Sequence, residues 1–190
     1  MLAIFVTPIL LGTLFFYNME RLGLKRASIN YGTLIEPAFP LKTVNLMQSG
    51  QPAERTKTLA KKWTLLYIAP ASCNLSCQDK LLLIKRVRLL MNEQMRRVRT
   101  LVVAKTDTLN KIIQQTRNNN PDLVYASVTP ATEVGGQEDD FLAQFPYREK
   151  IPVYLIDPLG NLMMVYAQEK PDAKKIIRDL SRLLKYSRLG

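Results

Sequence analysis

Apolar and polar positions along residues 63–186 follow two alternating patterns. Short runs rich in branched and aromatic residues are typical of buried strands, and apolar residues at helical spacing are typical of amphipathic helices. The predicted strands cover residues 63–69, 99–104, 123–128, 151–156 and 162–166, and the predicted helices cover about 73–96, 106–117 and 170–186. Strands that alternate with helices pair in parallel through right-handed crossovers, and a terminal hairpin adds antiparallel neighbours. The pattern therefore predicts an α/β fold with a mixed central sheet flanked by helices.

A different pattern opens the chain. Residues 1–19 carry no charged side chain, and their length is at the low end of what spans a bilayer. No basic side chain precedes this apolar run and no small-residue cleavage site follows it, which favours an uncleaved transmembrane anchor over a signal peptide. Arg21, Lys25 and Arg26 follow the run directly, and basic residues in that position favour a cytosolic domain.

Residues 20–60 are polar and rich in proline between the anchor and the first strand of the domain. Short apolar stretches at 29–31 and 41–47, with a turn signal at 49–52, predict a linker leading into an N-terminal hairpin. The predicted organisation is an anchor at 1–19, a linker and hairpin at 20–60, and one globular domain at 61–190. A chain of this length can bury one full core.

The two cysteines of the chain, Cys73 and Cys77, follow the strand at 63–69 and open the next helix. Ser72 is the expected N-cap, with Gln78 and Asp79 in the first turn. Residues four apart on a helix share one face, with about 6 Å between Cα atoms, which suits either a disulfide or two thiolates around a soft ion such as Cu(I). The helix N-terminus is expected to favour the thiolate of Cys73 in particular. A structural disulfide is the alternative, but the position between a buried strand and a helix favours a reactive pair.

Composition narrows the chemistry further. The chain has no histidine, which excludes imidazole catalysis, the Ser-His and Cys-His nucleophile pairs and every histidine-containing metal site. Two cysteines alone cannot form a closed zinc site. The net charge of +11 favours an acidic protein surface or anionic lipid as a partner. No aromatic platform or recognition motif for nucleic acid is present in the sequence, so nucleic acid is not an expected partner.

The run KWTLLYIAPASCNLSC (62–77), together with VYLIDPLGNL (153–162), resembles the SCO/SenC family of cytochrome c oxidase assembly proteins. The likeness covers about residues 30–184. It implies a thioredoxin-like three-layer sandwich with an N-terminal membrane anchor helix, located on the periplasmic side of the inner membrane, where the CuA centre of oxidase subunit II is assembled. In thioredoxin-like proteins a cis proline lies against the cysteine pair, which nominates Pro152 as the residue that faces Cys73.

The resemblance also implies copper ligands. Family members bind copper through the two cysteines and a histidine shortly before the strand that contains YLIDP. Tyr147-Arg148-Glu149-Lys150 occupies that neighbourhood here, and Gln78 replaces the proline that commonly follows the second family cysteine. This chain therefore departs from the family pattern for copper binding through three ligands. Thiol exchange does not depend on these positions.

Three functions remain open. In the first, the chain is a thiol–disulfide oxidoreductase that needs no cofactor: Cys73 attacks, Cys77 resolves, and Pro152 shapes the docking surface. In the second, Cys73 and Cys77 carry Cu(I), with Met163 or Met164 as a candidate third ligand, although core packing is the expected role of these methionines. In the third, the chain is a non-enzymatic assembly factor with a structural disulfide. The expected partners are oxidase subunit II or another copper-site protein, and the membrane.

Overall fold

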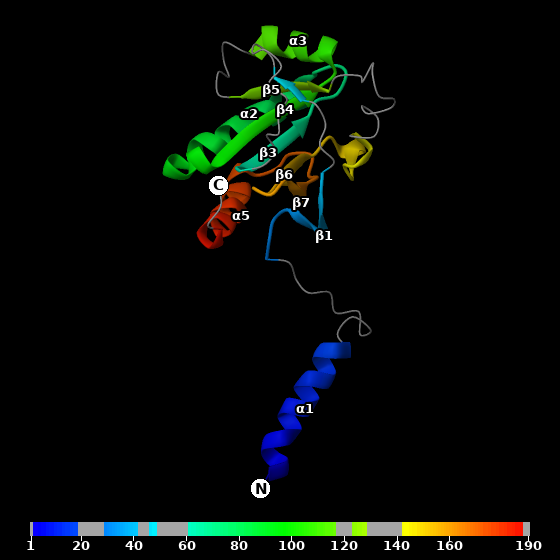
Figure 1. Ribbon diagram of the computed structural model, residues 1–190, viewed down its shortest axis with the longest axis vertical. Coiled ribbons are helices and arrows are strands. Elements are labelled where there is room, and N and C mark those ends of the chain that lie inside the picture. Colours follow the sequence, from blue (N-terminus) through cyan, green and yellow to red (C-terminus); the bar gives the residue numbers. More distant parts are fainter. Residues whose placement is uncertain are drawn as a thin grey trace.

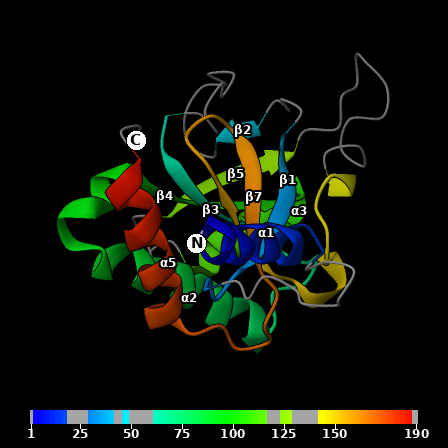
Figure 2. The same cartoon turned by 90° about the horizontal axis from the view of Figure 1, so that it is seen from below.

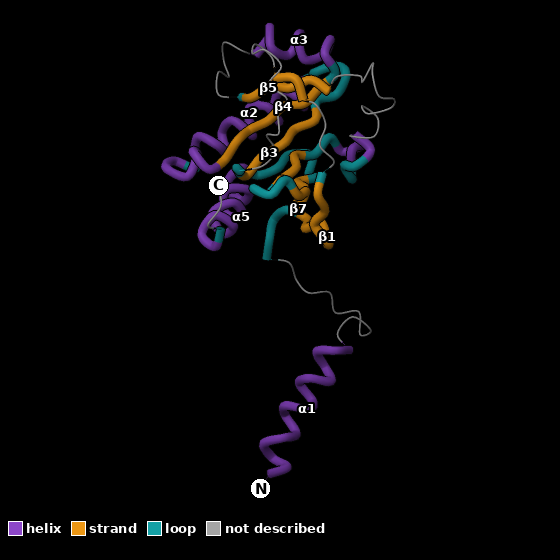
Figure 3. Tube along the Cα trace, viewed as in Figure 1, coloured by secondary structure: helices purple, strands orange, loops and turns teal. Residues whose placement is uncertain are grey.

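The computed structural model describes residues 2–18, 29–41, 46–48, 61–116, 123–128 and 142–187. The described helices are α1 (Leu2–Asn18), α2 (Leu75–Leu90), α3 (Thr106–Thr116) and α5 (Ala173–Tyr186), with the 3-10 helices η1 (Asn92–Arg97) and η2 (Arg148–Lys150). The described strands are β1 (Thr33–Pro40), β2 (Leu46–Gln48), β3 (Trp63–Ile68), β4 (Val98–Ala104), β5 (Val124–Val128), β6 (Val153–Ile156) and β7 (Asn161–Tyr166). Figure 1 shows these elements, and Figure 3 distinguishes the helices from the strands in the same view. From β3 to α5 the predicted order of elements is confirmed.

The described strands form one seven-stranded mixed sheet in the order β1-β7-β6-β3-β4-β5-β2. β3, β4 and β5 run parallel, as crossovers through α2 and α3 require, and β6 and β7 run antiparallel to their neighbours. β3 lies in the middle of the sheet, and every residue from Trp63 to Tyr67 is buried. The cysteines therefore follow the central strand of the fold.

The two faces of the sheet are covered differently. One face packs against α2, α3 and α5, which contribute buried residues such as Leu81, Ile112 and Leu180 to a single apolar cluster. α2 and α5 lie side by side on this face (Figures 1 and 2). The opposite face packs against Leu41 and against Leu142 and Phe145, from the segment before η2. The thioredoxin-like sandwich is present, but in the described part of the chain a short segment takes the place of a long helix in one outer layer.

The hairpin predicted within residues 20–60 is wrong for the described strands. β1 pairs with β7 at one edge of the sheet, and β2 pairs with β5 at the other edge. Edge strands present unpaired backbone N–H and C=O groups, and β1 and β2 each satisfy one of these edges. β1 lies between the two apolar stretches expected to form the hairpin, and β2 overlaps only the end of the second. The turn predicted at 49–52 lies outside the described residues. The sheet thus begins before residue 61, where the globular domain was expected to start.

The helix predicted to run to about Arg96 ends earlier, at Leu90. Asn92 adopts a φ of 50°, a left-handed conformation that asparagine tolerates and that interrupts the helical repeat. The chain continues as η1 until β4 begins. Met91, at the break, is still buried, so the apolar spacing runs across it and does not reveal it.

The uncharged N-terminal segment forms α1, whose 17 residues extend about 25 Å at 1.5 Å per residue. Each side chain from Ile4 to Tyr17 is exposed, and α1 stands clear of the sheet in Figure 1. Within the described ranges, no helix combines the length and the apolar character needed to cross a membrane.

Candidate functional site

The two cysteines form a disulfide at the N-terminus of α2, with 5.1 Å between their Cα atoms. Cys77 lies in the first turn of the helix, whereas Cys73 precedes it, so the pair does not stack on one helical face as predicted. The N-cap between them is Asn74, whose side-chain Oδ1 accepts a hydrogen bond from the Cys77 N–H at 3.1 Å. The cap satisfies a helix-terminal N–H group and fixes the backbone of Cys77.

Ser72, the predicted N-cap, lies two residues before the observed one. Because α2 starts at Leu75, Asp79 falls beyond the first turn, which contains no acidic residue. Ser72 and Asn74 flank Cys73, and both residue types cap helices well, so local preference alone could not decide between them.

Hydrogen bonds from neighbouring elements hold the segment between β3 and α2. The Ala69 N–H donates to the carbonyl oxygen of Val103 in β4 at 2.8 Å. The hydroxyl of Thr108, near the start of α3, donates to the carbonyl oxygen of Ala71 at 3.1 Å. The sequence predicted Thr108 only as part of the helix at 106–117. Its second role follows from parallel topology, which brings the N-termini of α2 and α3 to the same edge of the sheet.

The two halves of the disulfide differ in exposure. Cys77 is 2% exposed and belongs to the apolar cluster of the helix-covered face, whereas Cys73 is half-buried and packs at its border. A thiolate arriving from solvent therefore has better access to the Sγ atom of Cys73. Of the two halves of the disulfide, Cys73 is therefore the accessible one and Cys77 the sheltered one.

Pro152 is buried just before β6. It lines a hollow of about 390 Å³ together with Ala69 and Pro70, which places it beside the segment that leads into Cys73. The cis bond implied by the family resemblance is wrong, because Ile151–Pro152 is trans and the cis peptide bond among the described residues is Glu36–Pro37. The turn into β6 is made instead by Ile151, whose φ of 47° is rare for a branched residue.

Copper ligands are few at this site. Cys73 and Cys77 are bonded to each other, and only after reduction would they supply two soft thiolates. Across the described ranges, no three Cys, Asp or Glu side chains are arranged so that they could hold a metal ion. Arg148 and Glu149, in the position of the family histidine, line the hollow beside Pro152. Arg148 is cationic and cannot be the third ligand, and Glu149 offers a hard carboxylate oxygen, which the soft Cu(I) ion does not favour.

Met164 has the core role that the sequence predicted. It is 1% exposed, and its Sδ would lie 2.5 Å from a Cβ atom added at Gly32, so the sulfur packs against the backbone of that glycine. Met163 packs against the same cluster while half-buried. Both belong to β7, which β6 separates from β3. Neither methionine is placed next to the cysteines by the sheet order.

Comparisons with known proteins agree with this architecture. Residues 63–187 match the family described as transmembrane-like, thioredoxin-like, C-terminal domain. No curated protein sequence matches the chain. The structure is similar to yeast Sco1 with copper bound, with a TM-score of 0.65 and 13% identity over 80% of this chain and 96% of that chain. It is also similar to a SCO1/SenC family lipoprotein from Bacillus anthracis, with a TM-score of 0.59 and 18% identity over 80% and 99% of the two chains.

A third similar structure is BsSco, a member of the Sco family of cytochrome c oxidase assembly proteins in which a disulfide switch was identified. Its TM-score is 0.59, at 12% identity over 82% of this chain and 99% of that chain. These three neighbours are Sco or SCO1/SenC proteins, which agrees with the resemblance read from the sequence, and their similarity confirms the thioredoxin-like fold. Because the matched sequence family covers residues 63–187, the chain belongs to the family of transmembrane-like, thioredoxin-like C-terminal domains.

Proposed function

We propose that this protein is a membrane-anchored thiol–disulfide oxidoreductase that acts in the assembly of a copper-containing oxidase. The observation that carries the proposal is the Cys73–Cys77 disulfide at the N-terminus of α2, with one sulfur accessible and the other sheltered. A structural disulfide gains nothing from such a difference in exposure, whereas an exchange reaction needs one attackable sulfur and one protected resolving thiol.

The reaction follows from this asymmetry. The thiolate of reduced Cys73 attacks a disulfide of the client protein, which forms a mixed disulfide and releases one client thiolate. The Cys77 thiolate then attacks the Sγ of Cys73, which forms the Cys73–Cys77 disulfide and releases the second client thiolate. The client gains two electrons and this protein loses two, so an external dithiol must reduce the pair for the next cycle. Pro152, beside the approach to Cys73, shapes the surface on which the client docks.

The structural neighbours support the proposed role in oxidase assembly. BsSco is described as a member of a family of cytochrome c oxidase assembly proteins, and its disulfide switch parallels the CxxxC disulfide here. The client would be oxidase subunit II or another protein whose copper site is built from cysteines. Those cysteines bind copper only when reduced, which is the state that the proposed reaction produces.

A trapping experiment tests the exchange reaction. The full-length Cys77→Ser and Cys73→Ser variants are reduced in detergent, and each is then mixed with a peptide disulfide. Cys77→Ser should accumulate a mixed disulfide, because the resolving thiol is absent. Cys73→Ser should accumulate at least about tenfold less, because its remaining thiol is sheltered. Non-reducing electrophoresis and mass spectrometry measure both products.

Each variant removes the disulfide, so a loss of stability is common to the two and cannot produce a difference between them. Equal trapping by both variants, or none by either, would leave the disulfide with a structural role only. Alkylation of the reduced protein across pH provides a second readout, since a reactive Cys73 should titrate below the ordinary cysteine value of about 8.5.

Cu(I) carriage is the second candidate function. Yeast Sco1, similar in fold, was crystallised with copper bound, and a reduced Cys73–Cys77 pair offers two soft ligands. Anaerobic titration against a competing Cu(I) chelator separates this function from exchange. If Cys77→Ser binds Cu(I) as tightly as the parent, the cysteine pair is not the copper site.

We also propose that residues 1–19 attach the domain to the inner membrane, with the domain on the periplasmic side. Two polar side chains in the second half of α1 bond to carbonyl oxygens of their own helix, Thr13 to Ile9 at 2.8 Å and Asn18 to Leu14 at 2.7 Å. The helix thereby presents a surface with few unsatisfied polar groups, as lipid requires. Membrane fractionation with external protease on spheroplasts tests both parts: a cytosolic domain would resist the protease.

A further inference from the structure

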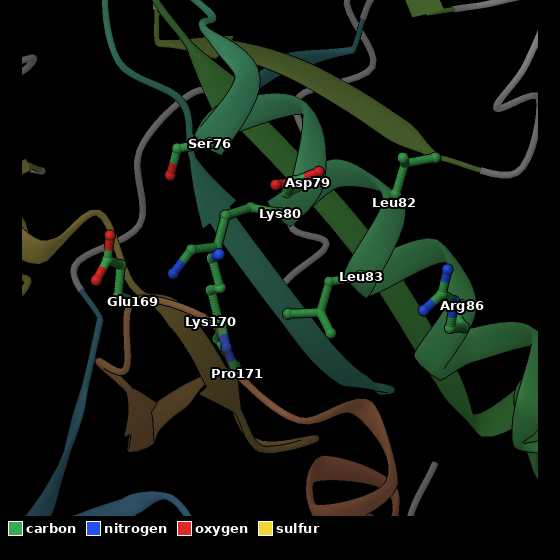
Figure 4. Close-up of a pocket in the computed structure, with 9 residues that line it drawn as sticks. All are labelled: Ser76, Asp79, Lys80, Leu82, Leu83, Arg86, Glu169, Lys170 and Pro171. Atoms are coloured by element: carbon green, nitrogen blue, oxygen red, sulfur yellow. The ribbon is translucent and has the colours of Figure 1, made fainter.

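A pocket of about 350 Å³ lies along α2, between that helix and the segment at 169–171 that leads to α5. Figure 4 shows Ser76, Lys80 and Glu169 towards one end of the pocket and Arg86 at the other, with Leu83 between them. Ser76 immediately precedes Cys77 in the first turn. The pocket therefore begins next to the disulfide and extends away from it along the helix.

The charges of the pocket favour an anion. Three of its residues are cations, Lys80, Arg86 and Lys170, and two are anions, Asp79 and Glu169. Lys80 is only 3% exposed, and its amine donates a hydrogen bond to the carbonyl oxygen of Gln168 at 2.9 Å. An ammonium group has three N–H donors, and the hydrogen bonds of the described residues account for one. A carboxylate entering the pocket would give this amine a charged partner.

Burial reinforces that preference. It lowers the pKa of Lys80, and the nearby Glu169 opposes the shift. Desolvation disfavours the charged amine, so an additional negative charge would stabilise it. Glu169 is exposed and therefore neutralises Lys80 only partly, because solvent screens its charge.

Apart from Ser76, apolar side chains form the remainder of the lining. Leu83 and Pro171 are half-buried, whereas Leu82 is 47% exposed on the surface of α2. A free inorganic anion would leave this apolar surface uncovered. A peptide segment that carries both carboxylates and an apolar side chain would use both parts of the pocket.

We propose that this pocket docks an acidic–apolar segment of the client protein and so presents the client's cysteine to Cys73. The inference rests on the proposed exchange reaction and adds to it a determinant of client choice. Lys80 lies three residues beyond Cys77 and Arg86 nine, so these cations are about 5 and 14 Å along the helix from the disulfide. An extended peptide covers that range in about two to four residues, which sets the distance between the client's cysteine and its carboxylates.

Two synthetic peptides test the proposal. One has a cysteine followed after about two residues by Glu-Leu-Glu, and the other has Gln-Leu-Gln in the same place. Both are labelled with a fluorophore and S-methylated, so they cannot exchange and fluorescence anisotropy reports binding alone. With full-length oxidised protein in nonionic detergent, the Glu peptide should bind about tenfold more tightly than the Gln peptide, and the difference should shrink at high salt.

Matched double variants locate the binding site. Arg86→Gln/Lys170→Gln should abolish the preference for the Glu peptide. Lys174→Gln/Arg178→Gln removes the same two charges from exposed positions on α5 outside the pocket, and should retain the preference. Equal binding of both peptides by the parent protein would overturn the proposal. So would an equal loss in the two double variants, or displacement of the peptide by free glutamate at comparable concentration.

The unmethylated peptides separate this proposal from the exchange reaction on which it rests. Selective binding without any thiol exchange would overturn the proposed function and leave the docking site in place. Exchange at equal rates with both peptides, without selective binding, would overturn the docking site alone.

Discussion

The two faces of the sheet differ in which buried polar groups they contain and in whether those groups have hydrogen-bond partners. The helix-covered face contains the disulfide together with buried Asp179 and Lys80, and the side chain of Tyr67. Among the described residues no hydrogen-bond partner faces the Tyr67 hydroxyl or the Trp63 Nε1. On the opposite face the Tyr154 hydroxyl donates to the carbonyl oxygen of Pro146 at 2.6 Å, inside an otherwise apolar cluster.

This difference bears on the stability of the two faces. Buried polar groups destabilise a fold only where they are unpaired, so the Tyr67 hydroxyl and the Trp63 Nε1 reduce stability on the helix-covered face, whereas the paired Asp179 and Lys80 do not. The face that carries them here is also the face from which α2 presents the disulfide. We therefore expect substitutions on the helix-covered face to change stability in both directions, and substitutions on the other face only to reduce it.

The largest effect is expected at Asp179. Its carboxylate accepts hydrogen bonds from the N–H groups of Tyr31 and Gly32, both at 3.0 Å, and is 2% exposed. Asp179→Ala leaves these N–H groups unpaired and should lower the free energy of unfolding by about 3 kcal/mol in urea titrations. Asp172→Ala removes the exposed N-cap carboxylate of the same helix and should cost about 1 kcal/mol. Equal losses would mean that the burial of Asp179 has no energetic consequence.

The next effect is expected at Gly32, on the same face. A Cβ atom there would lie 2.5 Å from Met164 Sδ and 2.7 Å from Tyr166 Cε1. Because Tyr166 is fully buried and cannot move away freely, Gly32→Ala should lower the free energy of unfolding by about 2 kcal/mol. Gly12→Ala, which meets no atom within 4 Å, serves as the control and should leave the unfolding of the domain unchanged. A Gly32→Ala protein as stable as the parent would show that Met164 relaxes at no cost.

A smaller effect is expected at the helix cap beside the disulfide. Asn74→Ala removes the acceptor for the Cys77 N–H and should cost about 1 kcal/mol, measured by thermal unfolding of the oxidised protein. Ser72→Ala should cost less than about 0.5 kcal/mol, because Ser72 is exposed and does not cap the helix. A larger loss from Ser72→Ala would move the cap to the position predicted from the sequence.

The strands and helices from residue 63 onwards could be predicted because each is encoded by its own local pattern. The run at 63–69 is apolar apart from Thr64 because β3 is buried on both faces, and the spacing of Ile176, Leu180 and Leu184 marks the buried side of α5. The cysteine pair was found for the same reason, since a strand, a cap and a helix follow one another directly in the sequence.

The features that could not be predicted depend on residues far apart in the chain. The sequence predicted one hairpin within residues 20–60, and only the free edges beside β7 and β5 determine where β1 and β2 pair. Asp179 bonds to residues 147 and 148 positions away, and Lys80 bonds to Gln168. A local stretch of sequence contains no signal for contacts over such separations. The sequence placed Cys73 and Cys77 together at the start of a helix, as the structure has them, and their role in catalysis stays a prediction. The buried amine of Lys80 could not be predicted, because a lysine at that helical position is usually solvent-exposed.

A last pair of substitutions, with expected effects of about 1 kcal/mol, compares the two faces directly, with one substitution on each. Tyr67→Phe removes a buried hydroxyl that has no partner among the described residues and should raise the free energy of unfolding by about 1 kcal/mol at neutral pH. Tyr154→Phe removes a hydroxyl bonded to Pro146 and should lower it by about 1 kcal/mol. Destabilisation by both substitutions would mean that a water molecule satisfies Tyr67, and the contrast between the faces would disappear.

Alkaline pH provides the control for that pair, because there both substitutions should act in the same direction. Burial raises the pKa of Tyr67 and of Tyr154, for Tyr154 with a smaller raising contribution from Glu149 and an opposing one from Arg148. Above the ordinary tyrosine value of 10.0, the unfolded chain therefore loses these protons while the folded chain keeps them, and stability falls as pH rises. Each substitution should remove a slope that approaches about 1.4 kcal/mol per pH unit above pH 10. Urea titrations at neutral and alkaline pH would thus separate the hydrogen bond, which differs between the faces, from burial, which does not.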